Sequence, residues 1–220
     1  MAKVVVLVSG GVDSAAALGL ALEQGLDTVA VHFRISEADK RAEEKAGRLV
    51  AHFGKMFGRP VKLVVVPFWF VLESILEKCE RRFACVLCKR MMERIAEKIA
   101  LEENALALVK GDSLGQVASQ TLANMNAEKG SAKTPILRPL LGLDKLEIEA
   151  IARKFKVLEI GNMPSGCCPI PEKPATSAKR QLVEELEKGL DVEALALKAF
   201  GKKNRVNSLW KKGGVVRGRK

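Results

Sequence analysis

Residues 3–14 read KVVVLVSGGVDS, and this stretch decides the fold. A run of apolar and β-branched residues precedes a Ser-Gly-Gly turn, and an alanine-rich segment, 15–24, follows it. This order predicts a buried parallel strand, then a tight glycine loop, then a helix. We therefore expect an α/β fold built on a doubly wound, mostly parallel sheet, in which ligands bind beyond the carboxyl ends of the strands.

The loop after this strand has the composition of a phosphate site. The start of a helix offers backbone N–H groups and the positive end of a dipole. Gly10 and Gly11 let the main chain approach an anion where a Cβ would collide, and Ser9 and Ser14 supply hydroxyl donors. Asp13 would repel a bare phosphate, so we expect its carboxylate to act through Mg²⁺. The alternative is an ordinary strand-to-helix turn.

Two familiar glycine loops do not fit this stretch. No lysine follows the glycines as in G-x-x-x-x-G-K-[ST], and adjacent glycines do not match G-x-G-x-x-G. The sequence SGGVDS (9–14) instead resembles the PP-loop signature, S-G-G-x-D-S, of the ATP pyrophosphatases, which have an adenine nucleotide alpha-hydrolase-like fold. Members of that superfamily cleave ATP between the α and β phosphates and leave AMP on the substrate. The resemblance implies ATP as the cofactor.

Composition sets the broad class of protein. The 220 residues suffice for one sizeable α/β domain, predicted over 1–200, with a basic tail over 201–220. No apolar run approaches the roughly 20 residues that span a bilayer, and no signal peptide is recognisable, so we expect a cytoplasmic protein. A net charge of +11 favours a polyanionic partner, nucleic acid first; a basic surface typical of thermophiles is the alternative.

The five cysteines favour metal or redox chemistry over a secreted disulfide scaffold. Cys85 and Cys88 form a C-x-x-C pair entering a helix, where the dipole and neighbouring Lys and Arg stabilise thiolates. Such thiolates ligate soft metals or attack sulfur. Cys79 follows an apolar stripe and is predicted to be a small packed residue. Cys167 and Cys168 lie in a proline-rich loop.

Periodicity predicts the remaining elements. Further strands are expected over 27–33, 60–66, 105–109 and 136–140. A helix is expected over 36–57, with a capping-box pattern at 36–39. Further helices are expected over 67–76, from the C-x-x-C pair to 101, and over 143–155, 176–188 and 192–200. Small and hydrogen-bonding side chains crowd residues 110–122, and on a parallel sheet they would face the same crevice as the Ser-Gly-Gly loop.

Three further stretches narrow the family. CKRMM (88–92), GDSLGQVASQTL (111–122) and LRPL (137–140) resemble the catalytic domain of tRNA 4-thiouridine synthases, also called thiamine-biosynthesis-type tRNA sulfurtransferases. The resemblance runs from about Lys3 to about Lys188. It implies that O4 of a tRNA uridine is activated as an adenylate and that a persulfide or sulfide then displaces AMP, with a link to thiamine thiazole sulfur supply.

By position, the resemblance also assigns site residues. It implies ATP contacts at Leu7, Val8, Lys89, Gly111 and Gln120 and makes Asp13 the acid needed for catalysis. Cys167 falls where the family keeps a cysteine that helps deliver sulfur. We expect neither the N-terminal RNA-binding domain nor the C-terminal rhodanese-like domain of long family members. Sulfur would then come through the chain's own cysteines, from a donor protein or from free sulfide. We expect tRNA as a partner, together with a homodimer or a separate RNA-binding subunit.

This resemblance strengthens the case for a functional role of the cysteines, because archaeal-type relatives carry the C-x-x-C pair with a downstream cysteine. We predict that Cys85, Cys88 and Cys167 are catalytic and hold an iron–sulfur cluster with one open iron. Cys168 is the spare or the actual third ligand, and a redox disulfide, a persulfide pair or a structural zinc are alternatives. Two other functions remain open: a PP-loop amide ligase, and a nucleotide-binding subunit or regulator without turnover.

Overall fold

The structure, a computed structural model, describes residues 1–38, 40–117, 119–164, 168, 172–206, 210–211 and 214–215. The strands are β1 (Lys3–Leu7), β2 (Asp27–Arg34), β3 (Lys62–Pro67), β4 (Ala107–Val109), β5 (Ile136–Leu137), β6 (Asn204–Val206), β7 (Trp210–Lys211) and β8 (Gly214–Val215). The helices are α1 (Val12–Glu23), α2 (Arg41–Met56), α3 (Trp69–Lys78), the 3-10 helix η1 (Arg81–Phe83), α4 (Ala84–Glu102), α5 (Leu122–Glu128), α6 (Lys145–Lys154), α7 (Leu158–Asn162), α8 (Arg180–Glu187) and α9 (Val192–Gly201).

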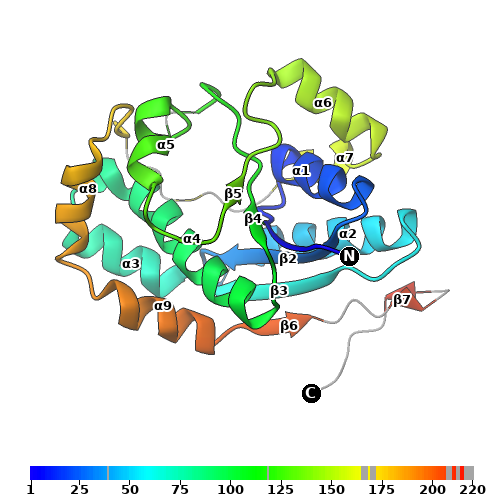
Figure 1. The fold of residues 1–220 in the computed structure, drawn as a ribbon, viewed down its shortest axis with the longest axis horizontal. Helices are drawn as coiled ribbons and strands as arrows, with labels where there is room; N and C mark the ends of the chain where they lie inside the picture. The colour runs from blue at the N-terminus through cyan, green and yellow to red at the C-terminus, as the bar shows by residue number, and fades with distance from the viewer. Residues whose placement is uncertain are drawn as a thin grey trace.

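The described residues form a six-stranded sheet in the order β5-β4-β1-β2-β3-β6 (Figure 1). The five strands from β5 to β3 are parallel, and β6 pairs antiparallel with β3 at one edge. The predicted fold class, a doubly wound and mostly parallel sheet, is confirmed.

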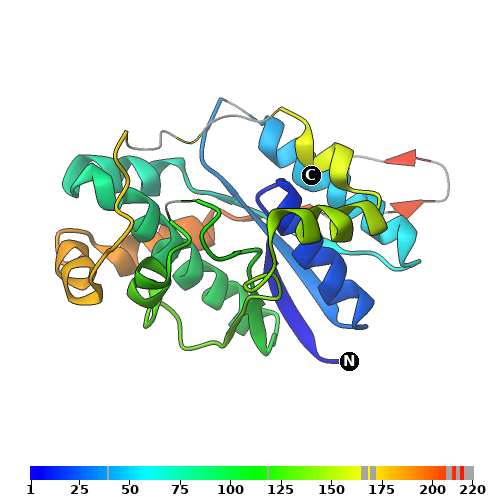
Figure 2. The same cartoon turned by 90° about the horizontal axis from the view of Figure 1, so that it is seen from above.

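Helices cover both faces of this sheet, as the view from above shows (Figure 2). One buried core joins Val5, Val31 and Val64 to α3, α4, α8 and α9, and the other joins Val4 and Val6 to α1, α2 and α6. Neighbouring residues of β1 therefore point to opposite cores, as alternation along a strand requires. Because both faces are covered, the strands are continuous runs of apolar residues rather than alternating ones.

The strand order places a topological switch point beside β1. The chain moves from β1 through β2 to β3, then returns to the other side of β1 with β4. The loops that leave the carboxyl ends of β1 and β4 therefore diverge to opposite sides of the sheet. Such a switch point is where open α/β sheets bind ligands.

Several element boundaries differ from the prediction. The helix expected from residue 36 begins at Arg41, and its N-cap Lys40 makes no side-chain cap, so the capping-box assignment at 36–39 was wrong. Residues 37–38 form a bend instead, on the path that leads from the end of β2 to the start of α2 beside Gly10. The short helices α5 and α7 were not predicted, because five to seven residues are too few for a periodic pattern to be recognised.

The carboxyl-terminal part starts with an edge strand. Helix α9 ends at Gly201, and β6, inside the segment expected as a tail, pairs with β3. The division of the chain at residue 200 stays a prediction. In the described part of the chain, every helix is too short or too polar to cross a membrane.

Candidate active site

The loop after β1 is fixed by its two serines. The Ser9 amide donates to Ser14 Oγ at 3.2 Å, and the Gly11 amide donates to Ser9 Oγ at 3.2 Å. The Ser14 hydroxyl donates to the Gly11 carbonyl at 3.0 Å. Gly11 is the N-cap of α1 and has no side chain to cap the first turn, so the start of the helix is left for a ligand. The predicted loop and helix are confirmed, and their role in phosphate binding stays a prediction.

Two glycines, Gly10 within this loop and Gly111 beside it, are required for steric reasons. Gly10 has φ +91°, and a Cβ there would lie 3.1 Å from the Cβ of Lys45 and 3.2 Å from the Ala42 carbonyl oxygen. A Cβ on Gly111, after β4, would lie 2.7 Å from the Asp13 carbonyl oxygen. Gly111 and the loop, 100 residues apart in sequence, are thus in direct contact, as the switch point predicts.

Asp13 occupies the first turn of α1. Burial raises the pKa of its carboxyl, the charge of Asp112 raises it further, and Lys145 at the start of α6 opposes the shift. A raised pKa means that the site disfavours the charged form of this carboxyl group, and a nearby cation would stabilise that form. The residues therefore fit a Mg²⁺ ion shared with phosphate oxygens, because both are hard oxygen ligands. Lys145 was not predicted as a site residue.

Several buried polar atoms of the described chain have no hydrogen-bond partner. Among the described residues, His32 Nε2, Ser113 Oγ and Gln120 Oε1 have no hydrogen-bond partner. His32 Nδ1 lies 2.8 Å from the Val8 carbonyl oxygen, so that nitrogen carries the proton, and burial lowers the pKa of the imidazole. His32 was left outside the predicted site, yet it directly contacts a predicted ATP residue. Buried polar groups of this kind are commonly completed by a ligand or water.

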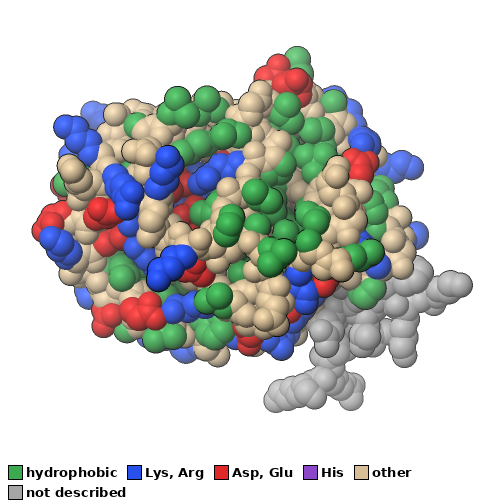
Figure 3. All heavy atoms as spheres, in the orientation of Figure 1, with side chains coloured by type: hydrophobic (Ala, Val, Ile, Leu, Met, Phe, Trp, Pro, Cys, Tyr) green, Lys and Arg blue, Asp and Glu red, His purple; other side chains and the backbone are tan. Residues whose placement is uncertain are grey.

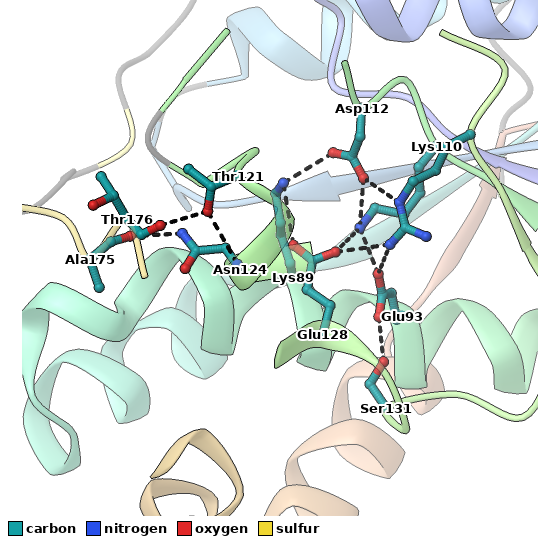
Figure 4. A network of polar contacts seen from close by, with 11 residues as sticks. Lys89, Glu93, Lys110, Asp112, Thr121, Asn124, Glu128, Ser131, Ala175 and Thr176 are labelled. Atoms are coloured by element: carbon teal, nitrogen blue, oxygen red, sulfur yellow. Dashed lines mark hydrogen bonds and ion pairs between the residues drawn. The ribbon is translucent and has the colours of Figure 1, made fainter. Parts of the chain in front are cut away.

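Three cations and three carboxylates form a buried ion cluster at the end of β4 (Figure 4). Its members are Lys89, Glu93, Lys110, Asp112, Glu128 and Arg138. The ammonium of Lys110 lies 2.6 Å from Glu93, 2.9 Å from Glu128 and 3.0 Å from Asp112. Since the formal charges cancel, the cluster satisfies the condition under which buried ions are tolerated.

Two other cations complete the ion cluster from separate elements. Lys89 Nζ, on α4, lies 3.0 Å from Asp112 and 3.4 Å from Glu128. Arg138, just after β5, contacts Asp112 at 3.2 Å and Glu128 at 3.0 Å. The neighbouring cations, Lys110 first, hold the pKa of Asp112 and that of Glu128 below their usual range, against the effect of burial.

Cysteines gather at the start of α4. Cys85 is half-buried and Cys88 is buried, both in the first turns of the helix. Burial raises the pKa of both thiols, and the charges of Cys168 and Cys85 raise that of Cys88 further. Cys168 packs against the buried core cluster that includes Cys88. Cys79 is buried at the end of α3, so its predicted packing role is confirmed.

The predicted metal set is only partly within the described chain. Cys167 lies outside the described residues. Among those that are described, no group of three His, Cys, Asp or Glu side chains is arranged to hold a metal ion. The assignment of Cys85, Cys88 and Cys167 as cluster ligands therefore stays a prediction, and the downstream cysteine that is described, Cys168, packs against the core cluster that includes Cys88.

A chain of contacts links the cysteines to the phosphate loop. Lys89 is one helical turn after Cys85, and its charge opposes the upward shift of the Cys85 pKa. Lys89 binds Asp112, whose neighbour Gly111 touches Asp13. Sequence reasoning brought these stretches together through the family resemblance. It missed Glu93, Lys110 and Glu128; Lys110 directly follows an apolar strand, whereas Glu93 and Glu128 stand among other charged and polar residues and gave no signal.

These features define the class of the protein: an α/β protein with the PP-loop fold of the ATP pyrophosphatase type. More specifically, the chain belongs to the family described as Thiamine biosynthesis protein (ThiI), whose model matches residues 1–192. The predicted family resemblance is therefore confirmed.

The names of two similar proteins agree with this assignment. The chain is 39% identical over 214 residues to a probable tRNA sulfurtransferase of Methanothermobacter thermautotrophicus, covering 94% of this chain and 54% of the relative. It is 41% identical over 197 residues to a probable tRNA sulfurtransferase of Brevibacillus brevis, covering 88% and 49%. The chain thus spans about half the length of the curated relatives it matches.

Solved structures show the same fold. A 4-thiouridine synthetase in complex with RNA and bound ATP aligns with a TM-score of 0.88 and 33% identity, covering 93% of this chain and 54% of that one. An NMN synthetase from Francisella tularensis aligns with a TM-score of 0.57 at 17% identity. The second similarity concerns the fold alone.

Proposed function

We propose that this chain is an ATP-dependent tRNA sulfurtransferase, which adenylates a tRNA uridine and replaces its O4 with sulfur. One observation carries the proposal: the phosphate loop and the cysteines are joined through Lys89, Asp112 and Gly111 at the carboxyl ends of the central strands. The similar 4-thiouridine synthetase was solved with RNA and ATP, and the related chains are named tRNA sulfurtransferases. We extend those activities to this chain.

The first half-reaction uses the loop after β1. The N–H groups of the first turn of α1 and the hydroxyls of Ser9 and Ser14 would bind phosphate oxygens of ATP. Mg²⁺, held by Asp13, would neutralise the charge that develops on the departing pyrophosphate. Uridine O4 would then bond to the α phosphorus, the bond from that phosphorus to the β-bridging oxygen would break, and N3 would lose its proton to solvent. The products are a uridine adenylate and pyrophosphate.

The second half-reaction needs a sulfur nucleophile. With hydrosulfide as the donor, sulfur bonds to C4, the C4–O4 bond breaks, and AMP leaves with its electron pair. The sulfur-bound proton then moves to N3 through solvent, which gives neutral 4-thiouridine, so the step is redox-neutral. Cys85, Cys88 and a downstream cysteine would hold an iron–sulfur cluster that delivers sulfide, because soft thiolates suit iron. The U34-tRNA thiolase from Methanococcus maripaludis, which shares only the fold, carries a [4Fe-4S] cluster.

The charge of the chain suits an RNA substrate. The whole chain carries a net charge of +11, and Lys and Arg side chains lie over α5 and α8 on the face drawn in Figure 3. Arg82 and Ala175 are joined by a backbone hydrogen bond of 2.8 Å, and Arg180 lies against Gly130. Exposed cations on η1, on the segment before α8 and at the end of α5 are thereby brought together beside the cysteines. Such a surface attracts the phosphates of tRNA in the cytoplasm.

A turnover assay tests the proposal. The protein, purified without oxygen, is incubated with ATP, Mg²⁺, bulk tRNA and sulfide, and pyrophosphate, AMP and thiolated nucleosides are measured. We expect RNA-dependent AMP formation and 4-thiouridine in digested tRNA. Turnover with ammonia in place of sulfide would favour an amide ligase, and ATP binding without turnover would favour a regulatory subunit. Either outcome would refute the sulfurtransferase.

A further inference from the structure

Lys45 joins the phosphate loop to the segment that leads to Cys168. It sits on α2, only 5% exposed, and its Cβ would contact any side chain placed on Gly10. Its ammonium donates to the carbonyl oxygens of Gly161 at 2.9 Å and Met163 at 2.6 Å. Burial lowers the pKa of this ammonium. A buried cation bonded to two carbonyls therefore fixes the end of α7.

The end of α7 also rests on the first residue of α1. A Cβ added at Gly161 would lie 2.8 Å from Val12 Cγ2 and 3.0 Å from the Val12 backbone nitrogen. The absence of a side chain at Gly161 thus lets the two backbones touch. The amino-terminal end of the segment that carries Cys168 is seated on the phosphate loop by both Lys45 and this contact.

The other end of the same segment is bound by the start of α5 (Figure 4). Asn124, fully buried, donates from Nδ2 to the Ala175 carbonyl at 2.7 Å and accepts from the Ala178 amide at 2.9 Å. Thr121 donates to the Thr176 carbonyl at 2.6 Å. The Ala175 amide in turn donates to the Arg82 carbonyl, just before the C-x-x-C pair.

We propose that Lys45 and Asn124 are positioning residues for sulfur transfer, which hold the two ends of the segment carrying Cys168 against the nucleotide site. This inference rests on the proposed function. Lys45 ties one end to the loop after β1, and Asn124 ties the other end to the residues that follow Gln120. Cys168 follows Met163 by five positions and precedes Ala175 by seven, so the length of the chain limits how far this cysteine can lie from either anchor.

The two half-reactions respond differently to losing these anchors. Adenylation uses the loop after β1 and its helix, whose serine hydrogen bonds do not involve either anchor. Sulfur transfer needs a donor within reach of C4, and a displacement of about 1 Å in such a reaction costs about 100-fold in rate. Loss of an anchor should slow only the second half-reaction.

The test compares two variants with matched controls on the same helices. Lys45→Met keeps the apolar stem and removes the donors, and the exposed Lys55→Met is its control on α2. Asn124→Ala removes both hydrogen bonds, and the exposed Asn126→Ala is its control on α5. For each protein we would measure thermal unfolding, kcat and KM for ATP in RNA-dependent pyrophosphate release, and the rate of 4-thiouridine formation.

We expect pyrophosphate release and the KM for ATP to stay within about 3-fold of wild type, while 4-thiouridine formation falls by about 10-fold to 100-fold. Both controls should retain both rates. Equal loss of both half-reactions in folded variants would overturn the proposal and place Lys45 in phosphate binding. Unchanged 4-thiouridine formation would overturn it as well. Failure of the proposed function is distinct, since wild-type protein would then form no AMP.

Discussion

Replacing Gly111 by alanine tests the contact on which the site is built. The added Cβ would lie 2.7 Å from the carbonyl carbon and oxygen of Asp13 and 2.8 Å from the Ser14 amide nitrogen. Ordinary contacts begin at 3.4 Å, so the loop after β4 must move away from α1 by about 0.7 Å. All of these neighbours are backbone atoms in the first turn of a helix, so no side-chain rotation can relieve the clash.

The expected cost follows from overpacking. Forcing a methyl group into a filled site destabilises by about 1–3 kcal/mol. For a domain of this size each kcal/mol lowers Tm by roughly 2–4 °C. A shift approaching 1 Å between Asp13 and the opposite wall should also slow pyrophosphate release by about 10-fold to 100-fold. The measurements are thermal unfolding and RNA-dependent pyrophosphate release.

Gly47→Ala is the matched control for this prediction. Gly47 lies inside α2, and no described atom is within 4 Å of the position of its Cβ. Alanine should there stabilise the helix by up to about 1 kcal/mol. The two substitutions are chemically identical and should act in opposite directions. A Gly111→Ala protein with the Tm and turnover of wild type would show that β4 and the phosphate loop are not in contact.

Three other substitutions test the remaining parts of the site. Asp13→Asn should reduce pyrophosphate release by about 100-fold to 1,000-fold without lowering Tm, because the raised carboxyl pKa means that the fold disfavours the charge; a lower Tm would contradict this. Lys110→Met should cost about 3–5 kcal/mol in urea unfolding at pH 7. The depressed pKa values of Asp112 and Glu128 stabilise the fold above the usual carboxyl pKa of about 4, so this loss should shrink as the pH falls below that value, and a loss independent of pH would refute the pairing. Cys85→Ser should stop 4-thiouridine formation but spare adenylation, and loss of both would make Cys85 a structural residue.

Local pattern was sufficient for the parts of the fold that are locally determined. The β1 strand, the Ser-Gly-Gly loop and α1 are contiguous, and each follows from periodicity and glycine chemistry. The start of α2 was predicted five residues too early, from a capping-box pattern at 36–39. The tertiary contacts that α2 makes with Gly10 outweighed this local pattern. A cap is worth only about 1 kcal/mol, which tertiary contacts readily exceed.

Residues that act only through distant partners were beyond reach of the sequence. Lys45 resembles any charged residue of an amphipathic helix, and its partners lie 116 and 118 positions away. Asn124 belongs to a helix too short to predict, and its role depends on residues 51 and 54 positions later. Glu93 and Glu128 gain meaning only from Lys110, Lys89 and Arg138, which the fold brings to them.

The composition of the ion cluster explains how Lys89 can serve two partners. In the structure its ammonium contacts Asp112 and Glu128, whereas the family resemblance assigns it to ATP. If Lys89 turned toward a phosphate, Asp112 would still be bound by Lys110 and Arg138, and so would Glu128. Each carboxylate would keep at least one cation, although two cations would then face three carboxylates. Releasing Lys89 should therefore cost less than losing Lys110, which contacts all three carboxylates. A cluster with two permanent cations and one that can be released keeps Lys89 charged, buried on one side and available to the nucleotide.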